Sequence, residues 1–337
     1  MVKCVEFGVR LPNSGPLASP EAILSSAEKA ESLGFDSVWV HDHITWGTEQ
    51  HRGHLSSGSA EALTSAQLPN FYESMTTLAV LAGATEKVKL GVAVVILPLR
   101  NPVVLAKQAA VLDALSGGRL LLGVAPGAPK ISEPEFAAVG VDYHKRGRIT
   151  DDYLRAMQAI WTQPLASYRG EYISFEEAQI FPKPLQKPWP PILIGGGERG
   201  LSPRALRRVL ELGNGWIPAY LTESELEEGI EQLHEGAKRV GRRNEKFVVG
   251  LEMFVGIGSS DNQAVATNSA SLTKNFSSVE EGLKRSLIGT TRTVNDKIER
   301  YEKIGLDYFE FKFVYPTIKN FHQMMEVFAS EIIPSFR

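Results

Sequence analysis

The sequence predicts an α/β fold, a TIM (β/α)8 barrel with insertions after its strands. Short apolar runs alternate with amphipathic segments along the whole chain, and three of the amphipathic segments end in glycine just before an apolar run. This alternation is typical of βα units around a parallel sheet. With 337 residues, 43% of them hydrophobic, the chain is long enough for one such barrel. The eight candidate strands lie at residues 4–10, 37–41, 88–95, 120–124, 192–195, 215–218, 247–257 and 308–314.

Helix starts between these strands have a recognisable signature. The pairs Ser19-Pro20, Asn101-Pro102 and Ser202-Pro203 each place a side-chain acceptor before a proline. Such an acceptor satisfies a free N–H of the first turn, and proline suits the first helical position. We therefore expect a helix to begin at each pair.

Helix ends are predicted by glycine. The segments "SLGFDSVWV", "ELGNGWIPAY" and "KIGLDYFEFKF" each place a glycine between an amphipathic run and an apolar one. We expect a left-handed glycine to end each helix and direct the chain into the next strand.

Three segments do not fit the repeating unit. They lie near residues 45–69, 167–191 and 259–286, and we interpret them as insertions within a single barrel domain spanning residues 1–337. Loops after strand C-termini build the active site of such barrels, so 45–69 is a candidate lid, with a surface loop as the alternative.

Composition excludes several classes of function. A formal charge of −3 with scattered charges gives no basic field for nucleic acid. The longest apolar runs, such as 92–97, are too short to span a membrane. The single cysteine, Cys4, excludes an internal disulfide, which suits a reducing compartment. We expect a cytoplasmic protein that acts on small molecules.

The segment 38–44, "VWVHDHI", runs from the second predicted strand into two histidines. Strand alternation puts Trp39, His41 and His43 on one face, at the active end of the barrel. A neutral histidine there can exchange protons with a substrate or cofactor, or it can be purely structural.

A metal site is the alternative interpretation of these histidines. His-x-His at a strand end is how metal-dependent hydrolases of barrel fold begin their site. The pair here follows the second strand rather than the first, and no later strand ends in a histidine or a cysteine–histidine cluster, so we predict no metal site. The nominal additional ligands are His51, His54, His144 and His234.

A glycine loop follows the fifth predicted strand. Residues 192–206, "ILIGGGERGLSPRAL", place Gly195, Gly196 and Gly197 before a Ser-Pro helix start. Bare backbone N–H groups at that position can close on an anion such as a phosphate. No Gly-Lys-Ser/Thr follows, so the loop is not a P-loop.

Longer segments give the chain a family resemblance. It resembles the luciferase-like monooxygenase superfamily, whose members use a flavin or the deazaflavin coenzyme F420. The matching segments, which cover most of the chain, are residues 89–127, "GFDSVWVHDH" at 34–43, "FAAVGVDYHKRG" at 136–147, "PKPLQKPWPPILIGGG" at 182–197, "GNGWIP" at 213–218 and, more weakly, 288–309.

The resemblance implies a barrel oxidoreductase that uses FMN or F420 to transfer hydride to, or oxygenate, a small organic substrate. It implies that His43 is the catalytic histidine. Strand alternation places His41 one pleat period deeper, as a hydrogen-bonding group, and points Asp42 the other way, where it would orient the loop. It also implies a bulge with a cis Ala93–Val94 peptide behind the cofactor ring. Gly195, Gly196 and Gly197 would hold the cofactor phosphate, with Arg199 or Arg204 as the counter-charge.

Two departures bear on the choice of cofactor. Deazaflavin enzymes of the superfamily often keep an acidic residue just past the fourth strand, but Ala128 stands at the nearest match here. Glu133 or Glu135 can replace it only if the loop folds back. The Asp42–His43 pair, in contrast, is more similar to deazaflavin enzymes than to the luciferases, so FMN and F420 both stay open.

Relatives commonly pair through helices beside the second and third strands. The segment 71–85, "FYESMTTLAVLAGAT", is apolar on more than one face, which predicts a homodimer or higher homo-oligomer. A metal-dependent hydrolase built on His41 and His43, and a non-catalytic cofactor-binding barrel, stay as alternatives. No motif identifies the substrate; aromatic residues that can line its pocket are Trp46, Phe71, Tyr72 and Phe276.

Overall fold

The computed structural model describes residues 4–45, 70–128, 132–197 and 199–337. Parallel strands form a barrel that β10 and β11 close by pairing Gly215 with Val248 and Trp216 with Val249. All eight predicted strands belong to it, so the predicted barrel is confirmed. In order around the barrel they are β1 (Glu6–Arg10), β3 (Ser37–Val40), β5 (Lys89–Ile96), β6 (Leu120–Ala125), β9 (Ile192–Gly195), β10 (Gly215–Ile217), β11 (Val248–Ile257) and β13 (Tyr308–Phe313).

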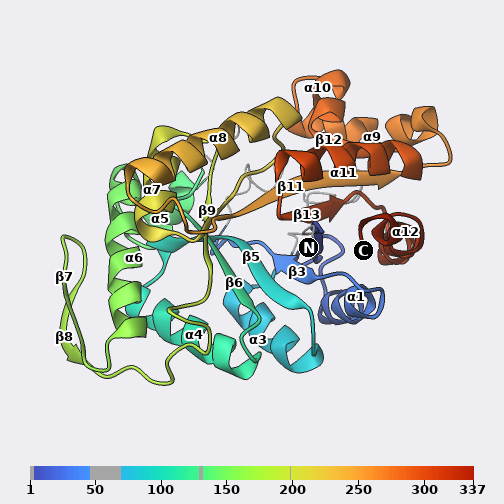
Figure 1. The fold of residues 1–337 in the computed structure, drawn as a ribbon. Helices are drawn as coiled ribbons and strands as arrows, with labels where there is room; N and C mark the ends of the chain where they lie inside the picture. Colours follow the sequence, from blue (N-terminus) through green and yellow to red (C-terminus); the bar gives the residue numbers. More distant parts are fainter. Residues whose placement is uncertain (1–3, 46–69, 129–131, 198) are drawn as a thin grey trace.

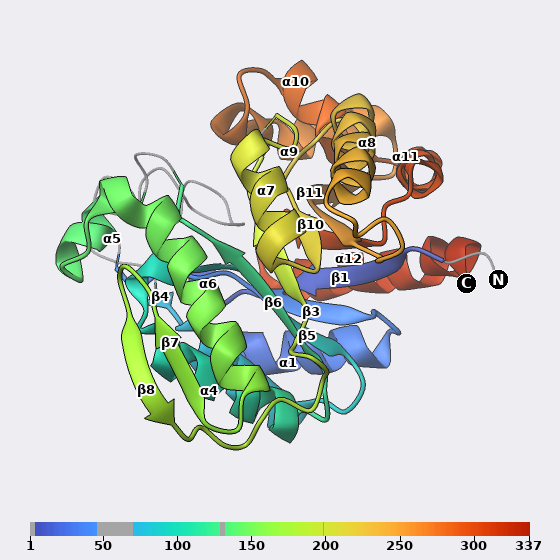
Figure 2. The same cartoon turned by 60° about the vertical axis from the view of Figure 1, so that its left-hand side comes forward.

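Helices surround the barrel on its outside (Figures 1 and 2). The first and last of them, α1 and α12, pack side by side, which joins the two ends of the fold. The helices are α1 (Pro20–Ser32), α3 (Ser74–Ala84), α4 (Pro102–Leu115), α5 (Glu133–Ala138), α6 (Arg146–Thr162), α7 (Pro203–Leu212), α8 (Glu223–Arg239), α9 (Asp261–Asn275), α10 (Val279–Lys284), α11 (Thr291–Ile304) and α12 (Ile318–Glu331), with short 3₁₀ turns η2 (Leu97–Leu99), η3 (Tyr143–Lys145) and η4 (Ile333–Phe336).

The three predicted helix starts are confirmed. Ser19 caps α1 by accepting from the Ala22 N–H, and Ser202 caps α7 in the same way. The Asn101 side chain accepts from two N–H groups at the start of α4. In each case the proline follows directly at the first helical position, where its missing N–H costs nothing.

The predicted helix ends are correct at two glycines and wrong at the third. Gly34 and Gly305 adopt φ of 82° and 107°. Gly213, which ends α7, is extended with φ −113°. Its small size is needed for another reason: a Cβ there would lie 2.8 Å from the Ile194 side chain, so glycine lets the end of α7 approach β9.

Additional strands lie outside the closed barrel. The two-residue strands β2 (Ser14–Gly15) and β4 (Asn70–Phe71) pair with each other, and β7 (Ala166–Arg169) and β8 (Ser174–Ala178) form a hairpin beside α6. Strand β12 (Ser286–Gly289), which the sequence analysis did not predict, pairs with the second half of β11. The candidate lid at 45–69 lies almost entirely outside the described residues.

The barrel interior has an apolar floor. Trp39 and Tyr308 are buried there with their rings stacked at 5.2 Å, and Leu193 and Ile217 pack beside them. The neighbouring strands leave room for the indole, because a Cβ at Gly8 or Gly91 would lie about 2 Å from it (2.3 and 2.2 Å). Among the described residues, no helix is long and apolar enough to cross a membrane.

Candidate active site

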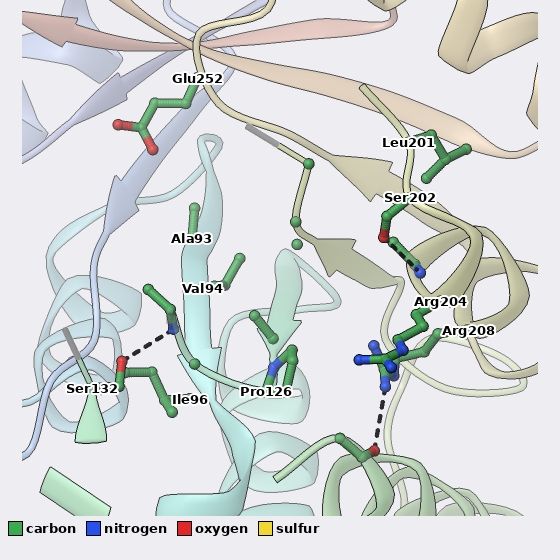
Figure 3. Close-up of a pocket in the computed structure, with 18 of the residues that line it drawn as sticks. Ala93, Val94, Ile96, Pro126, Ser132, Leu201, Ser202, Arg204, Arg208 and Glu252 are labelled. Carbon is green, nitrogen blue, oxygen red and sulfur yellow. Dashed lines mark hydrogen bonds between the residues drawn. The ribbon is translucent and has the colours of Figure 1, made fainter. Parts of the chain in front are cut away.

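The C-terminal ends of the barrel strands surround a cavity of about 1160 Å³. Figure 3 shows Glu252, Ala93 and Val94 on one side of it and Arg204 and Arg208 on the other. A cavity of this size accommodates a tricyclic coenzyme together with a small substrate. Every residue that the sequence analysis assigned to the site lines it: His43, Ala93, Val94, Gly195, Gly196, Gly197 and Arg199.

His43 is paired with a buried carboxylate. Its Nδ1 lies 2.6 Å from Oε1 of Glu135, which is 1% exposed, and the other oxygen of Glu135 accepts the Ile44 N–H at 2.9 Å. The chain after β6 therefore folds back onto the end of β3. The sequence analysis set this as the condition for Glu135 to replace the acidic residue that is absent at Ala128. Because the carboxylate accepts a hydrogen bond, Nδ1 carries the proton and the ring orientation is fixed.

Asp42 points away from His43 into the wall of the barrel. It accepts hydrogen bonds from Ser74 Oγ at 2.8 Å and from the Ile96 N–H at 3.1 Å, and it pairs with Arg100. The carboxylate therefore ties the end of β3 to the end of β5 and to α3. These contacts agree with the loop-orienting role that strand alternation predicts for Asp42.

His41 lines the same cavity as His43. Its Nε2 lies 2.6 Å from Ser14 Oγ, and Asn13 donates to its carbonyl oxygen. The Phe71 ring lies against both histidines, with centroids 5.0 Å and 5.5 Å away.

The third strand carries the bulge. The register between β5 and β6 shifts between Val92 and Val95, and the Ala93–Val94 peptide is cis. Both side chains line the cavity, where they present a small apolar surface on which a flat ring can lie.

The glycine loop follows β9 and leads into α7. Gly196 and Gly197 have φ of 127° and 105°, and a Cβ on Gly197 would lie 2.3 Å from the Gly200 carbonyl. A Cβ on Gly195 would lie 2.9 Å from Val94. The Gly196 carbonyl is held by the Trp216 indole N–H at 2.8 Å. The loop is therefore a fixed, bare-backbone cradle beside the bulge, and its residues fit a phosphate group.

Cations extend the site beyond this cradle. Arg207 and Arg208 share Asp151, which neutralises part of their charge. Arg199 and Arg204 line the cavity without an ion-pair partner among the described residues. Arg146 and Arg148, at the start of α6, line it as well.

A buried charged layer lies between the apolar floor and the cavity, and the sequence analysis missed it. Arg10 donates to Glu310 and to Glu252, both at 2.7 Å, and Tyr220 donates to Glu252. Glu252 and Glu310 also border a second cavity of about 140 Å³ next to Ala93 and Val94. The detectable signal was a charge at an inward position of an otherwise apolar strand, as in "GLEMFVGI" and "YFEFKF".

The pKa values of the two carboxyl groups in this layer shift in opposite directions. Burial raises the pKa of Glu310 to about 8, although Arg10 opposes the shift. Burial acts the same way on Glu252, but Arg10 and Lys312 hold its pKa below the ordinary value. Glu252 is therefore the carboxyl group of this layer that ionises more readily, and burial opposes the ionisation of Glu310.

The remaining candidates fall in several places. His144 lines the cavity on the arginine side, whereas His234 is exposed on α8. Tyr72 packs against the main core, and Phe276 packs edge-on to Tyr220 and Phe254. Trp46, His51 and His54 lie outside the described residues. Within the described part of the chain, no three His, Cys, Asp or Glu side chains gather as a metal site would require.

Comparison with known proteins gives consistent matches. The family model described as luciferase-like monooxygenase matches residues 5–308. The FMNH2-dependent dimethylsulfone monooxygenase of Pseudomonas putida is 28% identical over 305 residues, covering 80% of this chain and 79% of that protein.

Solved structures share the fold. An F420-dependent secondary alcohol dehydrogenase, in complex with an F420–acetone adduct, superposes with a TM-score of 0.80 at 20% identity and covers 99% of both chains. The oxygenating constituent of 3,6-diketocamphane monooxygenase from Pseudomonas putida, in complex with FMN, superposes with a TM-score of 0.74 at 18% identity over 99% of both chains.

Proposed function

The chain belongs to the luciferase-like monooxygenase family, and from this premise we propose that it is an F420-dependent oxidoreductase that interconverts an alcohol and a carbonyl compound. One observation carries the proposal: His43 lines the cavity and its Nδ1 is held at 2.6 Å by the buried carboxylate of Glu135. Alcohol oxidation releases a hydride and a proton, and a histidine held in this way takes up the proton on its other ring nitrogen.

His43 and Glu135 have different roles in the proposed reaction. His43 removes the substrate hydroxyl proton at Nε2, while Glu135 fixes the ring and stabilises the positive charge that forms on it. The bound coenzyme would accept the hydride. In the reverse direction, His43 returns the proton to the carbonyl oxygen.

The residues around the bulge and the glycine loop would hold the coenzyme. Ala93 and Val94 would support the ring, Gly195 to Gly197 would bind the phosphate, and Arg199 would supply a counter-charge. The cations beyond the cradle favour F420 over FMN, because F420 continues past its phosphate into an acidic tail. Arg146, Arg148 and Arg204 line the cavity and would lie near such a tail.

An FMN-dependent monooxygenase is the second candidate, and the sequence relationship favours it. The dimethylsulfone monooxygenase of Pseudomonas putida, with 28% identity, works with FMNH2. In that case the same cradle would hold the FMN phosphate, and the apolar bulge and floor would help to exclude water from the reacting centre.

Binding of the two cofactors distinguishes these candidates. Purified protein is titrated with F420 and, separately, with FMN, oxidised and reduced, with cofactor fluorescence as the readout. We expect tight binding of F420 and turnover of F420 with an alcohol but without oxygen consumption. Tight FMN binding with substrate-dependent oxygen uptake would favour the second candidate. Tight binding of neither would contradict both.

The remaining expectations complete the proposal. The protein is a single domain of residues 1–337, with insertions near 45–69, 167–191 and 259–286. It works in the cytoplasm as a homo-oligomer, on a small organic substrate and without nucleic acid or membrane partners. The single cysteine, Cys4, is a free thiol, which suits a reducing compartment. The low reduction potential of a deazaflavin suits such a compartment as well.

A further inference from the structure

Lys312 differs from the other residues of β13. The alternate residues Tyr308, Glu310 and Lys312 face the barrel interior, and the first two are buried. Lys312 alone in this strand is partly exposed, and it lines the main cavity. Because β13 lies inside a closed barrel between β1 and β11, the ammonium group is exposed to the cavity rather than to the outer surface.

The ammonium group of Lys312 has no hydrogen-bond acceptor or ion-pair partner among the described residues. Its Nζ lies over the Phe254 ring, 4.7 Å from the ring centroid. A lysine carries three N–H donors and no acceptor, so this ammonium faces the cavity with donors that no described protein group accepts. A ligand that brings an oxyanion to this place would accept from them.

The carboxyl groups near Lys312 already accept hydrogen bonds from other residues. Arg10 binds both Glu252 and Glu310, and Tyr220 donates to the second oxygen of Glu252. The second oxygen of Glu310, Oε2, has no hydrogen-bond partner among the described residues, Lys312 included. Glu252 and Glu310 act on Lys312 through space, but within the described part of the chain both form their ion pairs with Arg10 and neither forms one with Lys312.

We propose that Lys312 recognises an anionic group on the substrate, a carboxylate or a similar oxyanion, and holds it on the β13 side of the cavity. The proposal deepens the function given above and rests on it. Arg199 and Arg204 bind the coenzyme anions beside β9, and β10 and β11 separate that strand from β13. Two separate cationic regions thus assign the coenzyme and the substrate to different sides of one cavity.

Matched ligand pairs test this assignment. Benzoate and benzamide have nearly the same shape, but only benzoate carries a charge, and the Phe71 and Tyr220 rings that line the cavity suit an aromatic probe. Each is titrated by calorimetry into the wild type and Lys312→Met, with and without bound cofactor. We expect the wild type to prefer benzoate by about 10- to 100-fold and Lys312→Met to lose that preference.

Lys274→Met is the matched control. Lys274 lies on α9, does not line the cavity, and its charge lowers the pKa of Lys312. The Lys274→Met substitution also removes one positive charge near Lys312. It therefore distinguishes direct contact with the ligand from a general electrostatic effect. We expect this variant to keep the preference for benzoate.

The pH dependence supplies a second readout. Burial, assisted by Arg10, lowers the pKa of Lys312 to about 8. The charged and titratable groups that act on it are Arg10 from β1, Glu252 from β11, Glu310 from its own strand and Lys274 from α9. Above that pKa the ammonium is lost, so benzoate affinity falls about tenfold per pH unit while benzamide affinity stays constant.

The outcomes separate this inference from the proposed function. Failure of the protein to bind either cofactor contradicts the proposed function, whatever the probes show. Equal affinity of the wild type for benzoate and benzamide, no saturable benzoate binding, or an undiminished preference in Lys312→Met overturns the role of Lys312, even if F420 binds tightly.

Discussion

His43 and Glu135 form a unit in which only the histidine faces the cavity. Changing His43 to Asn keeps a polar side chain of similar reach but removes the group that exchanges protons. We expect turnover to fall by about 10²- to 10⁴-fold, the usual effect of losing a positioned acid or base, while the cofactor still binds. Steady-state kinetics and cofactor titration of the same variant measure the two quantities.

Glu135 acts through the histidine, so we describe it as a positioning residue. Glu135→Gln should lower kcat with little change in KM, and Glu135→Asp should restore part of the loss. His234→Asn, at an exposed position on α8, is the control histidine. Full turnover by His43→Asn, or an equal loss in His234→Asn, would show that the assignment of His43 is wrong.

Glu310 gives a prediction for stability. Its pKa rises from the ordinary 4.5 to about 8 because of burial, so the folded protein keeps a proton that the unfolded chain has released. Stability therefore falls as pH rises through this window. Glu310→Gln cannot ionise, and its stability relative to the wild type should increase from pH 5 to about 8 and then level off. Urea denaturation at several pH values measures this difference; a constant difference would contradict it.

At the scale of secondary-structure elements, Asp42 and Arg100 connect the ends of β3 and β5. The Asp42 side chain is fully buried and that of Arg100 is 11% exposed. Arg100→Met would leave a buried carboxylate without its counter-ion, and we expect a loss of about 3–5 kcal/mol in the free energy of unfolding. Arg300→Met breaks an exposed pair with Glu223 and should cost at most about 1 kcal/mol. Denaturant midpoints compare the two; equal losses would contradict the role of Asp42.

The glycine loop yields a prediction for cofactor binding. A Cβ on Gly196 would meet no protein atom within 4 Å, so a side chain there would enter the space of the cradle. Gly196→Val should therefore weaken cofactor binding, through this bulk and through the strain of φ 127°. Substrate affinity at saturating cofactor should change little. Gly241→Val, at another left-handed glycine with open space around it but outside the cavity, controls for strain. Unchanged cofactor affinity would remove the loop from the site.

The strands and helix starts were predictable because their signals are local. Apolar runs mark the strands, and Ser-Pro or Asn-Pro pairs mark the caps whatever surrounds them. Gly213 shows where local reasoning fails: the same residue type ends a helix there because of contact with Ile194, a neighbour known only from the fold.

The candidate site likewise contains some features that could be predicted from the sequence and others that could not. His43 and the glycine loop follow strand ends, so their places could be predicted from the chain order. The pairing of His43 with Glu135 depends on how the chain after β6 folds back, and 92 residues separate the two. The Arg10–Glu252–Glu310 layer joins three different strands, β1, β11 and β13, and only the closed barrel brings these charged residues together.

For the whole molecule, the exposed apolar residues of α3 and α4 give the last prediction. The two helices pack beside each other (Figure 1), and Val80 and Val104 are each 55% exposed on them. Since α3 and α4 flank β5, this face coincides with the helices through which we expect the protein to pair.

Charges at both positions, Val80→Glu with Val104→Glu, should convert the oligomer into a monomer in sedimentation experiments, because burying unpaired carboxylates opposes association. Val240→Glu, at a 52% exposed position after α8, should leave the oligomer intact. A wild-type protein that sediments as a monomer at micromolar concentration, or a double variant that still associates, would show that these helices do not form the interface.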